Sequence, residues 1–350
     1  MKTFVINGKF FSDRMQGIVR YGRELLGALD KNLTDGCVKL ILALPQNAVD
    51  VPVYNNISVI KIGNRTGIKW EQIDLASFMR KHKEYLLINF CNTTPFFIQP
   101  GITTVHDIMY KTFPQNYITL RNKISRIWHC IQYKYIFKHE NIILTVSEFS
   151  KNEIEKNYPK ARGKICVIPN GWQHVNEYKE NINWEKVYPD LKKNSFFFSL
   201  ATLANNKNVR WIIEVAKRNP KFTFAIAGKI YDGKFNDIPN NVKLLGYVSD
   251  EDACSLIKNC KAFIFPSIYE GFGIPPLEAL ALGANVISSN AACLPEVLGD
   301  SVNYFNPYNY DYNIKIENYE KKNQNALKKY SWDKSAEKLK NILNNEVITK

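Results

Sequence analysis

Residues 270–278 read E-G-F-G-I-P-P-L-E and stand between an apolar run at 262–265 and a second apolar run at 279–282. The first run has the length and composition of a buried strand, and the second, which Gly283 closes, is typical of a helix. The two glycines free the backbone of the turn, and the two prolines favour a first helical turn, whose amides have no intrahelical acceptor. The stretch therefore predicts a strand, a glycine loop and a helix N-terminus, a combination that binds phosphate.

Two carboxylates frame this corner, Glu270 in the loop and Glu278 in what we expect to be the first turn of the helix. A carboxylate at the second position can accept hydrogen bonds from both hydroxyls of a ribose. The alternative is that Glu270 is an ordinary loop carboxylate and that Glu278 only stabilises the positive end of the helix dipole. The spacing by itself leaves both interpretations open.

The longer stretch P-S-I-Y-E-G-F-G-I-P-P-L-E-A-L-A-L-G at 266–283 resembles the signature of retaining glycosyltransferases of the GT-B fold, family 4 (group 1) in particular. Further matches are G-I-V-R-Y-G-R-E-L at 17–25, T-V-H-D at 104–107 and V-I-P-N-G at 167–171. The resemblance extends over nearly the whole chain. It implies an α/β protein in which two Rossmann-like domains face each other across a cleft and a C-terminal helix crosses back to the first domain.

The length of 350 residues and the hydrophobic content of 45% independently favour two domains. Strands alternate with helices along the chain, which is the pattern of parallel sheets covered on both faces. We expect strands over 3–7, 37–44, 57–62, 85–90, 102–106, 141–147, 164–169, 196–200, 222–227, 242–245, 261–266 and 286–288, and helices from 17 and over 70–81, 117–138, 148–157, 209–218 and 323–346. The predicted organisation is an acceptor-binding domain at 1–170, a linker at 171–194, a nucleotide-sugar-binding domain at 195–322 and a C-terminal helix at 323–350.

The resemblance implies a role for each residue of the donor site. Glu278 holds the ribose, and Glu270 bonds hydroxyls of the transferred sugar. The diphosphate meets Lys207 and the loop and helix start formed by Gly271, Phe272, Gly273 and Ile274. Val248 lies in a loop that touches the nucleotide base through its backbone, and Gly17 lets the N-terminal loop approach the phosphates.

His106 ends the strand at 102–106 and would face the cleft from the first domain. A lone histidine is more often structural than catalytic, but its place at a strand's carboxyl end and within T-V-H-D indicates a functional side chain. The resemblance therefore assigns His106 and Glu270 to catalysis.

One phosphate loop departs from the family pattern G-T-L-x-x-R-K-N. Ala201 replaces its glycine and Asn206 replaces its arginine, whereas Lys207 is present. A lysine is a point charge and cannot reproduce the bidentate fork of an arginine. One phosphate contact is therefore missing or comes from elsewhere, for instance from Arg210. Outside the motif, Lys207 would be one lysine among many.

The expected reaction moves a hexose from a nucleotide diphosphate sugar to a glycan or lipid-linked acceptor in bacterial surface polysaccharide synthesis. GDP-mannose is the favoured donor, and UDP- and dTDP-sugars stay open. Front-face attack is favoured over a covalent intermediate on Glu270. No H-E-x-x-H or cysteine pair occurs, so we expect no metal and no cofactor besides the donor. Two other classes stay open: a GT-B sugar-nucleotide epimerase, and a non-catalytic basic membrane- or nucleic-acid-binding protein on a transferase scaffold.

The net charge of +14 is unevenly placed, because residues 1–170 hold 24 Lys and Arg against 13 Asp and Glu, whereas residues 171–350 hold 23 against 20. Within 117–138, basic residues alternate with an apolar and aromatic stripe, which suits an anionic membrane surface. The alternative is a solvated helix whose stripe faces the core. We expect no nucleic-acid partner, because no recognised binding motif accompanies the charge.

The chain has no apolar run long enough to span a membrane and no signal-peptide core at its start. Its seven cysteines are scattered, which argues against a disulfide framework. We therefore expect a cytoplasmic protein with reduced thiols, peripheral on the inner face of the plasma membrane if the basic stretch binds lipid.

Overall fold

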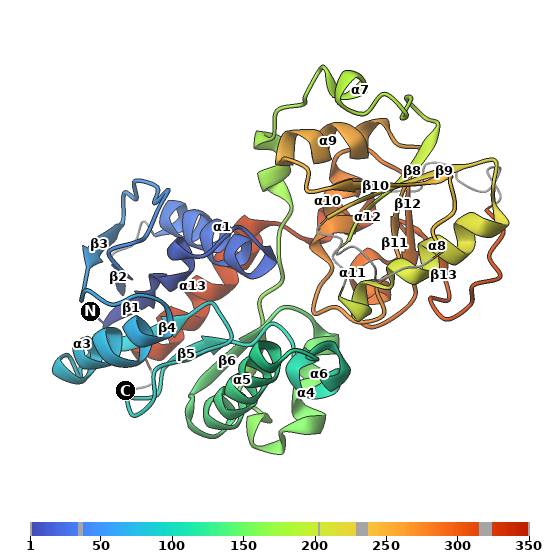
Figure 1. The fold of residues 1–350 in the computed structure, drawn as a ribbon. Coiled ribbons are helices and arrows are strands. Elements are labelled where there is room, and N and C mark those ends of the chain that lie inside the picture. The colour runs from blue at the N-terminus through green and yellow to red at the C-terminus, as the bar shows by residue number, and fades with distance from the viewer. Residues whose placement is uncertain (1, 34–37, 202–203, 229–236, 315–323, 349–350) are drawn as a thin grey trace. The chain divides into compact units, whose positions relative to one another are not determined.

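The computed structural model describes residues 2–33, 38–201, 204–228, 237–314 and 324–348 (Figure 1). Its contacts divide the chain into two compact units. The first comprises Met1–Gly171 and Trp332–Lys350, and the second comprises Trp172–Ser331. Each unit is a parallel sheet with helices, so the chain is an α/β protein with two Rossmann-like domains.

Seven parallel strands form the sheet of the first unit, in the order β3-β2-β1-β4-β5-β6-β7. They are β1 (Lys2–Asn7), β2 (Val38–Leu44), β3 (Ile57–Lys61), β4 (Leu86–Asn89), β5 (Ile102–Thr104), β6 (Ile142–Thr145) and β7 (Ile165–Val167). In the centre, Phe4 pairs with Leu40 on one side and with Leu86 on the other. All three side chains are buried, as expected where helices cover a parallel sheet.

The helices of the first unit fill the connections between these strands. They are η1 (Gly8–Ser12), α1 (Gly17–Asn32), α2 (Gly67–Lys69), the π-helical η2 (Trp70–Leu75), α3 (Ala76–Lys81), α4 (Met109–Thr112), η3 (Pro114–Asn116), α5 (Leu120–His139), α6 (Glu148–Asn157) and η4 (Pro159–Ala161). The helix expected over 117–138 begins three residues later, because Thr119 caps it: its hydroxyl accepts from the Asn122 amide at 3.2 Å.

Six parallel strands form the second sheet, in the order β10-β9-β8-β11-β12-β13. They are β8 (Phe196–Leu200), β9 (Thr223–Ala227), β10 (Val242–Gly246), β11 (Ala262–Phe265), β12 (Val286–Ser289) and β13 (Asn303–Phe305). Strand β13 was not predicted, because three residues with mixed polarity give no period to detect.

The helices of the second unit include three α-helices that the sequence did not indicate as helices, α7, α9 and α11. The elements are η5 (Gln173–Glu177), α7 (Trp184–Val187), η6 (Asn205–Lys207), α8 (Val209–Arg218), α9 (Asp250–Asn259), α10 (Ile274–Ala281), α11 (Leu294–Leu298) and α12 (Asn325–Lys329). Helix α9 is one of these three, and its cap Ser249 accepts from the Asp252 amide at 3.0 Å. The segment L-P-E-V-L at 294–298 forms the helix α11.

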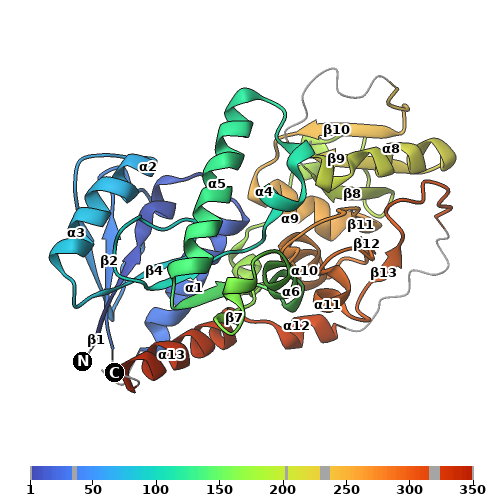
Figure 2. The same cartoon turned by 90° about the horizontal axis from the view of Figure 1, so that it is seen from below.

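Helix α13 (Trp332–Ile348) belongs to the first unit, where it lies against α1 (Figure 2). Its inward side chains Ala336, Leu339 and Leu343 are fully buried. Lys340 Nζ donates to the Asn32 carbonyl at 2.9 Å. The continuous helix expected over 323–346 is therefore two helices, α12 in the second unit and α13 in the first.

The segment expected as a linker is folded into the second unit from Trp172 onward. Trp184 and Leu191 are buried in that unit despite the polar residues around them. Asn181 Nδ2 and the Tyr188 hydroxyl both bond the carboxylate of Asp252, at 2.6 and 3.2 Å. The composition suggested a linker because two apolar anchors among many polar residues form no periodic pattern.

Parts of several predictions lie outside the described residues: Cys37 and the start of its strand, Thr202 and Leu203 of the phosphate loop, and residues 315–323. The six cysteines that the structure describes are not joined in disulfides. Within the described ranges, none of the helices combines the length and the hydropathy needed to span a bilayer.

Candidate functional site

The predicted phosphate corner is built on β11 and α10 at the carboxyl edge of the second sheet. Gly273 caps α10 with φ +84°, a conformation that side chains disfavour. A Cβ atom at this position would lie 2.6 Å from Leu294 Cδ2, so sterics also require glycine here. Gly271 has no positive φ, so only one of the two glycines uses the freedom that the sequence suggested.

Glu278 lies just past the first turn of α10, because the helix begins at Ile274 and a turn holds 3.6 residues. This corrects its predicted place in the first turn. Its Oε1 lies 2.7 Å from Nε2 of His174, and its side chain is 14% exposed. A carboxylate only accepts hydrogen bonds, so Nε2 carries the proton.

His174 was not predicted as a site residue. It belongs to η5, inside the segment expected as a linker, and its side chain is buried. Because 104 residues separate it from Glu278, no local spacing could have indicated the contact. Its position three residues after the V-I-P-N-G match was the one available signal.

Lys207 and Glu270 form an ion pair, with Nζ 2.7 Å from Oε1. The Glu270 side chain is 12% exposed, and the ammonium also lies 5.5 Å from the centre of the Phe265 ring. An ammonium has three donors, so it can keep its carboxylate partner and still bond a phosphate oxygen. The sequence expected both residues in the donor site but not their pairing.

Asn206 is buried and has a structural contact of its own. Its side-chain Nδ2 donates to the Tyr269 backbone carbonyl at 3.2 Å, and its backbone carbonyl accepts from the Ile268 amide at 2.8 Å. It thereby joins the loop after β8 to the loop that carries Glu270. Arg210, the other cation considered, is exposed in the first turn of α8.

The remaining predicted donor residues lie on neighbouring loops of the same edge. Val248 is half-buried between Gly246 (φ +69°) and the cap of α9, and Tyr247 beside it is almost fully exposed. Phe272 is buried, with its ring edge-on to Tyr330 at 5.1 Å. Tyr247 was not singled out from the sequence, although an exposed aromatic ring beside the expected base loop could stack on a base.

The order of the second sheet explains why these loops meet. Strands β9 and β10 are added on one side of β8, and β11 to β13 on the other, so the order of strand addition reverses between β8 and β11. Ligands of open α/β sheets bind outside the carboxyl ends of the strands at such a switch point. Lys207 follows β8 and Glu270 follows β11, so the ion pair sits at the switch point itself.

His106 follows β5 in the first unit and is buried. Its Nε2 lies 2.8 Å from the Phe90 carbonyl oxygen, which accepts only, so Nε2 is protonated and Nδ1 is the acceptor of a neutral ring. Burial lowers its pKa to about 4, and the bond to Phe90 opposes that shift. A ring this weakly basic can accept a hydroxyl hydrogen bond but is a poor proton acceptor at neutral pH.

Gly17 is the exposed first residue of α1 and has no positive φ. The side chain of the capping residue Gln16 makes no cap hydrogen bond. The first turn of α1 therefore lacks a side-chain cap at this end.

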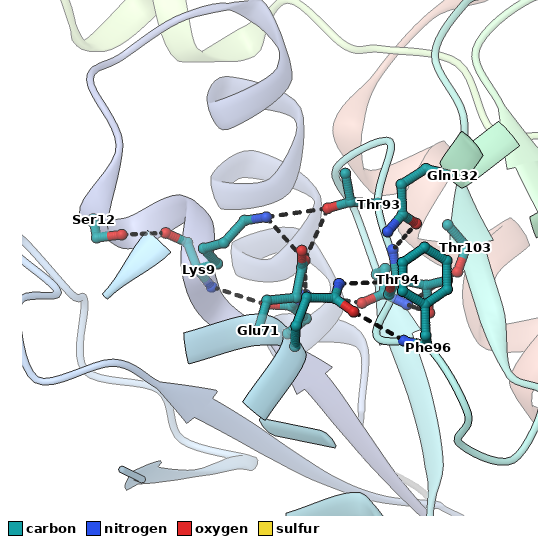
Figure 3. Close-up of polar contacts among 11 residues, drawn as sticks. Lys9, Ser12, Glu71, Thr93, Thr94, Phe96, Thr103 and Gln132 are labelled. Carbon is teal, nitrogen blue, oxygen red and sulfur yellow. Dashed lines mark hydrogen bonds and ion pairs between the residues drawn. The ribbon is translucent and has the colours of Figure 1, made fainter. Parts of the chain in front are cut away.

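A second buried ion pair lies at the switch point of the first sheet, between β1 and β4 (Figure 3). Glu71 Oε1 accepts from Lys9 Nζ at 2.9 Å, from Asn7 Nδ2 at 2.8 Å and from the Thr93 hydroxyl at 2.8 Å. Burial pulls the pKa of Lys9 down, but the charge and hydrogen bond of Glu71 outweigh it and leave that pKa raised. Glu71 Oε2 is buried and has no hydrogen-bond partner among the described residues.

Few features of the sequence indicated this pair. Lys9 lies in the turn after the first strand, where ligands bind, but Glu71 comes from a helix 62 positions later. Its segment is π-helical, a conformation often found at functional sites. Among the residues that the structure describes, no three His, Cys, Asp or Glu side chains are grouped to hold a metal ion.

Comparison with known protein families identifies the family of the part of the chain that holds the phosphate corner. Residues 181–350 match the family model described as glycosyl transferases group 1. This part of the chain belongs to the group 1 glycosyl transferases. O-antigen chain mannosyltransferase B of Escherichia coli is 29% identical to this chain over 250 residues, which cover 64% of the chain and 61% of that relative. The chain thus spans less than two thirds of that relative's length.

Solved structures show the fold of this chain. Sucrose-phosphate synthase (tll1590) from Thermosynechococcus elongatus superposes with a TM-score of 0.67 at 14% identity, over 100% of both chains. Anabaena Alr3699/HepE in complex with UDP and glucose superposes with a TM-score of 0.64 at 18% identity, over 98% of this chain and 99% of that one. The fold is GT-B, as the signature at 266–283 predicted.

Proposed function

We propose that the chain transfers a hexose, with retention, from a nucleotide diphosphate sugar to a glycan or lipid-linked acceptor in bacterial surface polysaccharide synthesis. The observation that carries the proposal is the corner at the second switch point, where the pairs Lys207–Glu270 and His174–Glu278 flank the start of α10. This corner combines a cation and free helix amides for a diphosphate with a carboxylate for ribose hydroxyls.

GDP-mannose is the donor that we favour, because a relative that aligns with 64% of this chain is an O-antigen chain mannosyltransferase. UDP- and dTDP-sugars are the alternatives, and the complex of Alr3699/HepE with UDP and glucose supports keeping UDP among them. No further cofactor enters the proposal, and the ammonium of Lys207 with the helix N-terminus takes the role of a divalent cation at the departing diphosphate.

The proposed reaction is front-face attack, with the leaving phosphate as base. As the glycosidic C–O bond breaks, its electron pair passes to the diphosphate oxygen and the acceptor hydroxyl adds to the same face of the anomeric carbon. The contact of Glu270 Oε1 with Lys207 supports this path, because a carboxylate bonded to an ammonium is a poorer nucleophile and suits hydrogen bonding to sugar hydroxyls. The neutral ring of His106 would accept from a hydroxyl through Nδ1.

We place this activity in the cytoplasm, peripheral on the inner face of the plasma membrane, where a lipid-linked acceptor would present its sugar. The excess of basic residues in the first 170 positions supports an anionic surface as a partner. Acceptor hydroxyls would be bound by the first unit.

Calorimetric titration with GDP, UDP, dTDP and ADP, with and without magnesium, tests the donor site. We expect one nucleotide to bind tightly, equally well in EDTA. Glu278→Ala should abolish that binding, and His174→Ala should weaken it about 10- to 100-fold, since a hydrogen bond to a charged group contributes about 1.5–3 kcal/mol. His174→Gln keeps an N–H donor and should retain more affinity than His174→Ala, and the partly exposed His82→Ala is the matched control.

Three outcomes would count against the proposal. Binding of no nucleotide would favour a non-catalytic scaffold. Interconversion of the sugar without an acceptor would favour an epimerase. Loss of binding on magnesium removal would contradict the metal-independent mechanism.

A further inference from the structure

Helix α5 has two apolar faces, and the structure covers one of them. Tyr133, Ile136 and Phe137 pack into the core of the first unit with β6 and α6. The other face is a row at helical spacing whose side chains are exposed, and it consists of Leu120 (75%), Ile124 (59%), Ile127 (55%) and Ile131 (49%). We call this row the outer face of α5. Each of the two interpretations of the 117–138 stripe therefore holds for part of it: some of its side chains pack in the core, and the outer face is exposed to solvent.

Cations surround the outer face, and α5 itself holds no acidic residue. Arg121 and Lys123 are exposed near its start, and Lys134 and Lys138 are exposed near its end. A solvent-exposed helix ordinarily mixes both signs of charge, so a purely basic helix with an exposed aliphatic row is typical of a surface that meets anionic lipid.

A pocket of about 500 Å³ opens beside the row and is lined by residues of α4, of α5 and of the end of α6. Its lining includes three cations from two helices, Lys111, Arg126 and Lys134, and no acidic residue. Arg126 is held in place because its Nε donates to the Tyr110 carbonyl at 2.9 Å.

The apolar part of the pocket wall comes from the outer face itself. Ile127 and Ile131 line the pocket together with Tyr158. The place for an anionic group therefore adjoins the exposed aliphatic row directly.

Aromatic stacking fixes this region on the unit. The Tyr110 ring of α4 stacks on His129 of α5 at 3.9 Å and on Tyr117 at 4.7 Å. The Tyr133 hydroxyl donates to the Asp107 carbonyl at 3.0 Å. The outer face and its pocket are thus presented by a helix that is anchored on its inner side.

We propose that the outer face of α5 docks on an anionic phospholipid bilayer, with the aliphatic row in the acyl boundary and a lipid phosphate in the Lys111–Arg126–Lys134 pocket. A second copy of the chain fits this surface poorly, because pairing two α5 faces would bring two acid-free basic helices together. Single-stranded nucleic acid fits poorly too, because stacking needs exposed aromatic rings and the row is aliphatic.

The inference deepens the proposed function, on which it rests for its setting, but it can fail alone because its test uses no sugar nucleotide. Flotation of the full chain with vesicles of phosphatidylcholine alone, or of equal parts phosphatidylcholine and phosphatidylglycerol, measures it. We expect binding at least about tenfold stronger to the anionic vesicles, weakening as salt rises. Excess glycerol phosphate should compete weakly, because it offers the phosphate without the acyl boundary.

Two double variants separate the two parts of the site. Ile127→Ser with Ile131→Ser should remove binding to both vesicles, and Arg126→Gln with Lys134→Gln should remove the preference for anionic ones. Ile68→Ser with Lys69→Gln, exposed on α2 of the same unit, is the matched control and should bind like the unchanged chain. Urea unfolding of each variant verifies that it is folded.

The proposal is overturned if the chain shows no preference for anionic vesicles or if the control pair loses as much binding as the α5 pairs. It is also overturned if sedimentation shows a dimer that Ile127→Ser with Ile131→Ser dissociates, because a second copy would then cover the face.

Discussion

Individual side chains at the candidate donor corner make structural contacts in addition to the binding roles proposed for the corner. Asn206 stands where the family pattern has an arginine, yet it is buried and bonded to the loop that presents Glu270. Replacing Asn206 with arginine would bury a charge at a position where a hydrogen bond from the side-chain amide now holds two loops together. Asn206 therefore has a structural role in the corner, and its presence in place of the arginine is no evidence that the phosphate loop has lost its function.

The buried ring of His106 links pH to stability. The unfolded side chain has its ordinary pKa of 6.5, whereas the folded one titrates at about 4. Between these values the unfolded chain binds a proton that the folded chain does not, so the free energy of unfolding falls as the pH drops from 6.5 toward 4. The difference corresponds to about 3 kcal/mol, and it is fully retained above pH 6.5.

Urea unfolding at about pH 7 and about pH 5 measures this dependence. His106→Gln should flatten it, and His82→Gln, at a partly exposed position, should leave it as it is. An equally steep loss of stability in His106→Gln would show that other groups cause the acid sensitivity.

At the scale of elements, the start of α10 depends on one glycine. Gly273 has φ +84°, and an added Cβ would lie 2.6 Å from Leu294 Cδ2. Gly283, just past the end of the same helix, has the same φ, but a Cβ atom added there would have no neighbouring atom within 4 Å. The two positions form a matched pair, since both substitutions strain the backbone and only one also creates a clash.

We expect Gly283→Ala to cost about 1–2 kcal/mol, the usual penalty of left-handed backbone for a side chain. Gly273→Ala should cost clearly more and should also weaken nucleotide binding, because Leu294 or the loop must move. Urea unfolding and GDP titration of both variants measure the difference. Equal losses of stability would mean that the corner relaxes around the new methyl group.

At the scale of the molecule, α13 is the last element in sequence but part of the first unit. Its Leu339 is fully buried against the unit that holds α1. Leu339→Ala should destabilise that unit by about 2–5 kcal/mol, the usual cost of deleting a buried leucine side chain.

Hydrogen exchange followed by mass spectrometry localises the effect. Leu339→Ala should speed exchange in α1 and leave α8 of the second unit unchanged, whereas exposed Lys338→Ala should alter neither. Faster exchange in α8 would show that the two units unfold together.

The alternation of strands and helices and the corner at 266–283 were predictable because they rest on local patterns: apolar runs, glycines, prolines and caps within a few residues of one another. Strand positions shifted by a residue or two at most ends, and β13 was too short to detect. The segment after Trp172 was misjudged because two buried anchors, Trp184 and Leu191, make no periodic signal.

The sequence by itself therefore determined the fold class, the family and the identity of the candidate donor residues. Only the tertiary structure revealed His174, Lys9 and Glu71 and decided which residues touch: His174 with Glu278, Lys207 with Glu270, and Lys9 with Glu71. It also decided which face of α5 meets solvent and which unit α13 completes. The physical reason is that these contacts join residues 62 to 104 positions apart, or separate chain segments, and sheet order and burial set such contacts while local spacing does not.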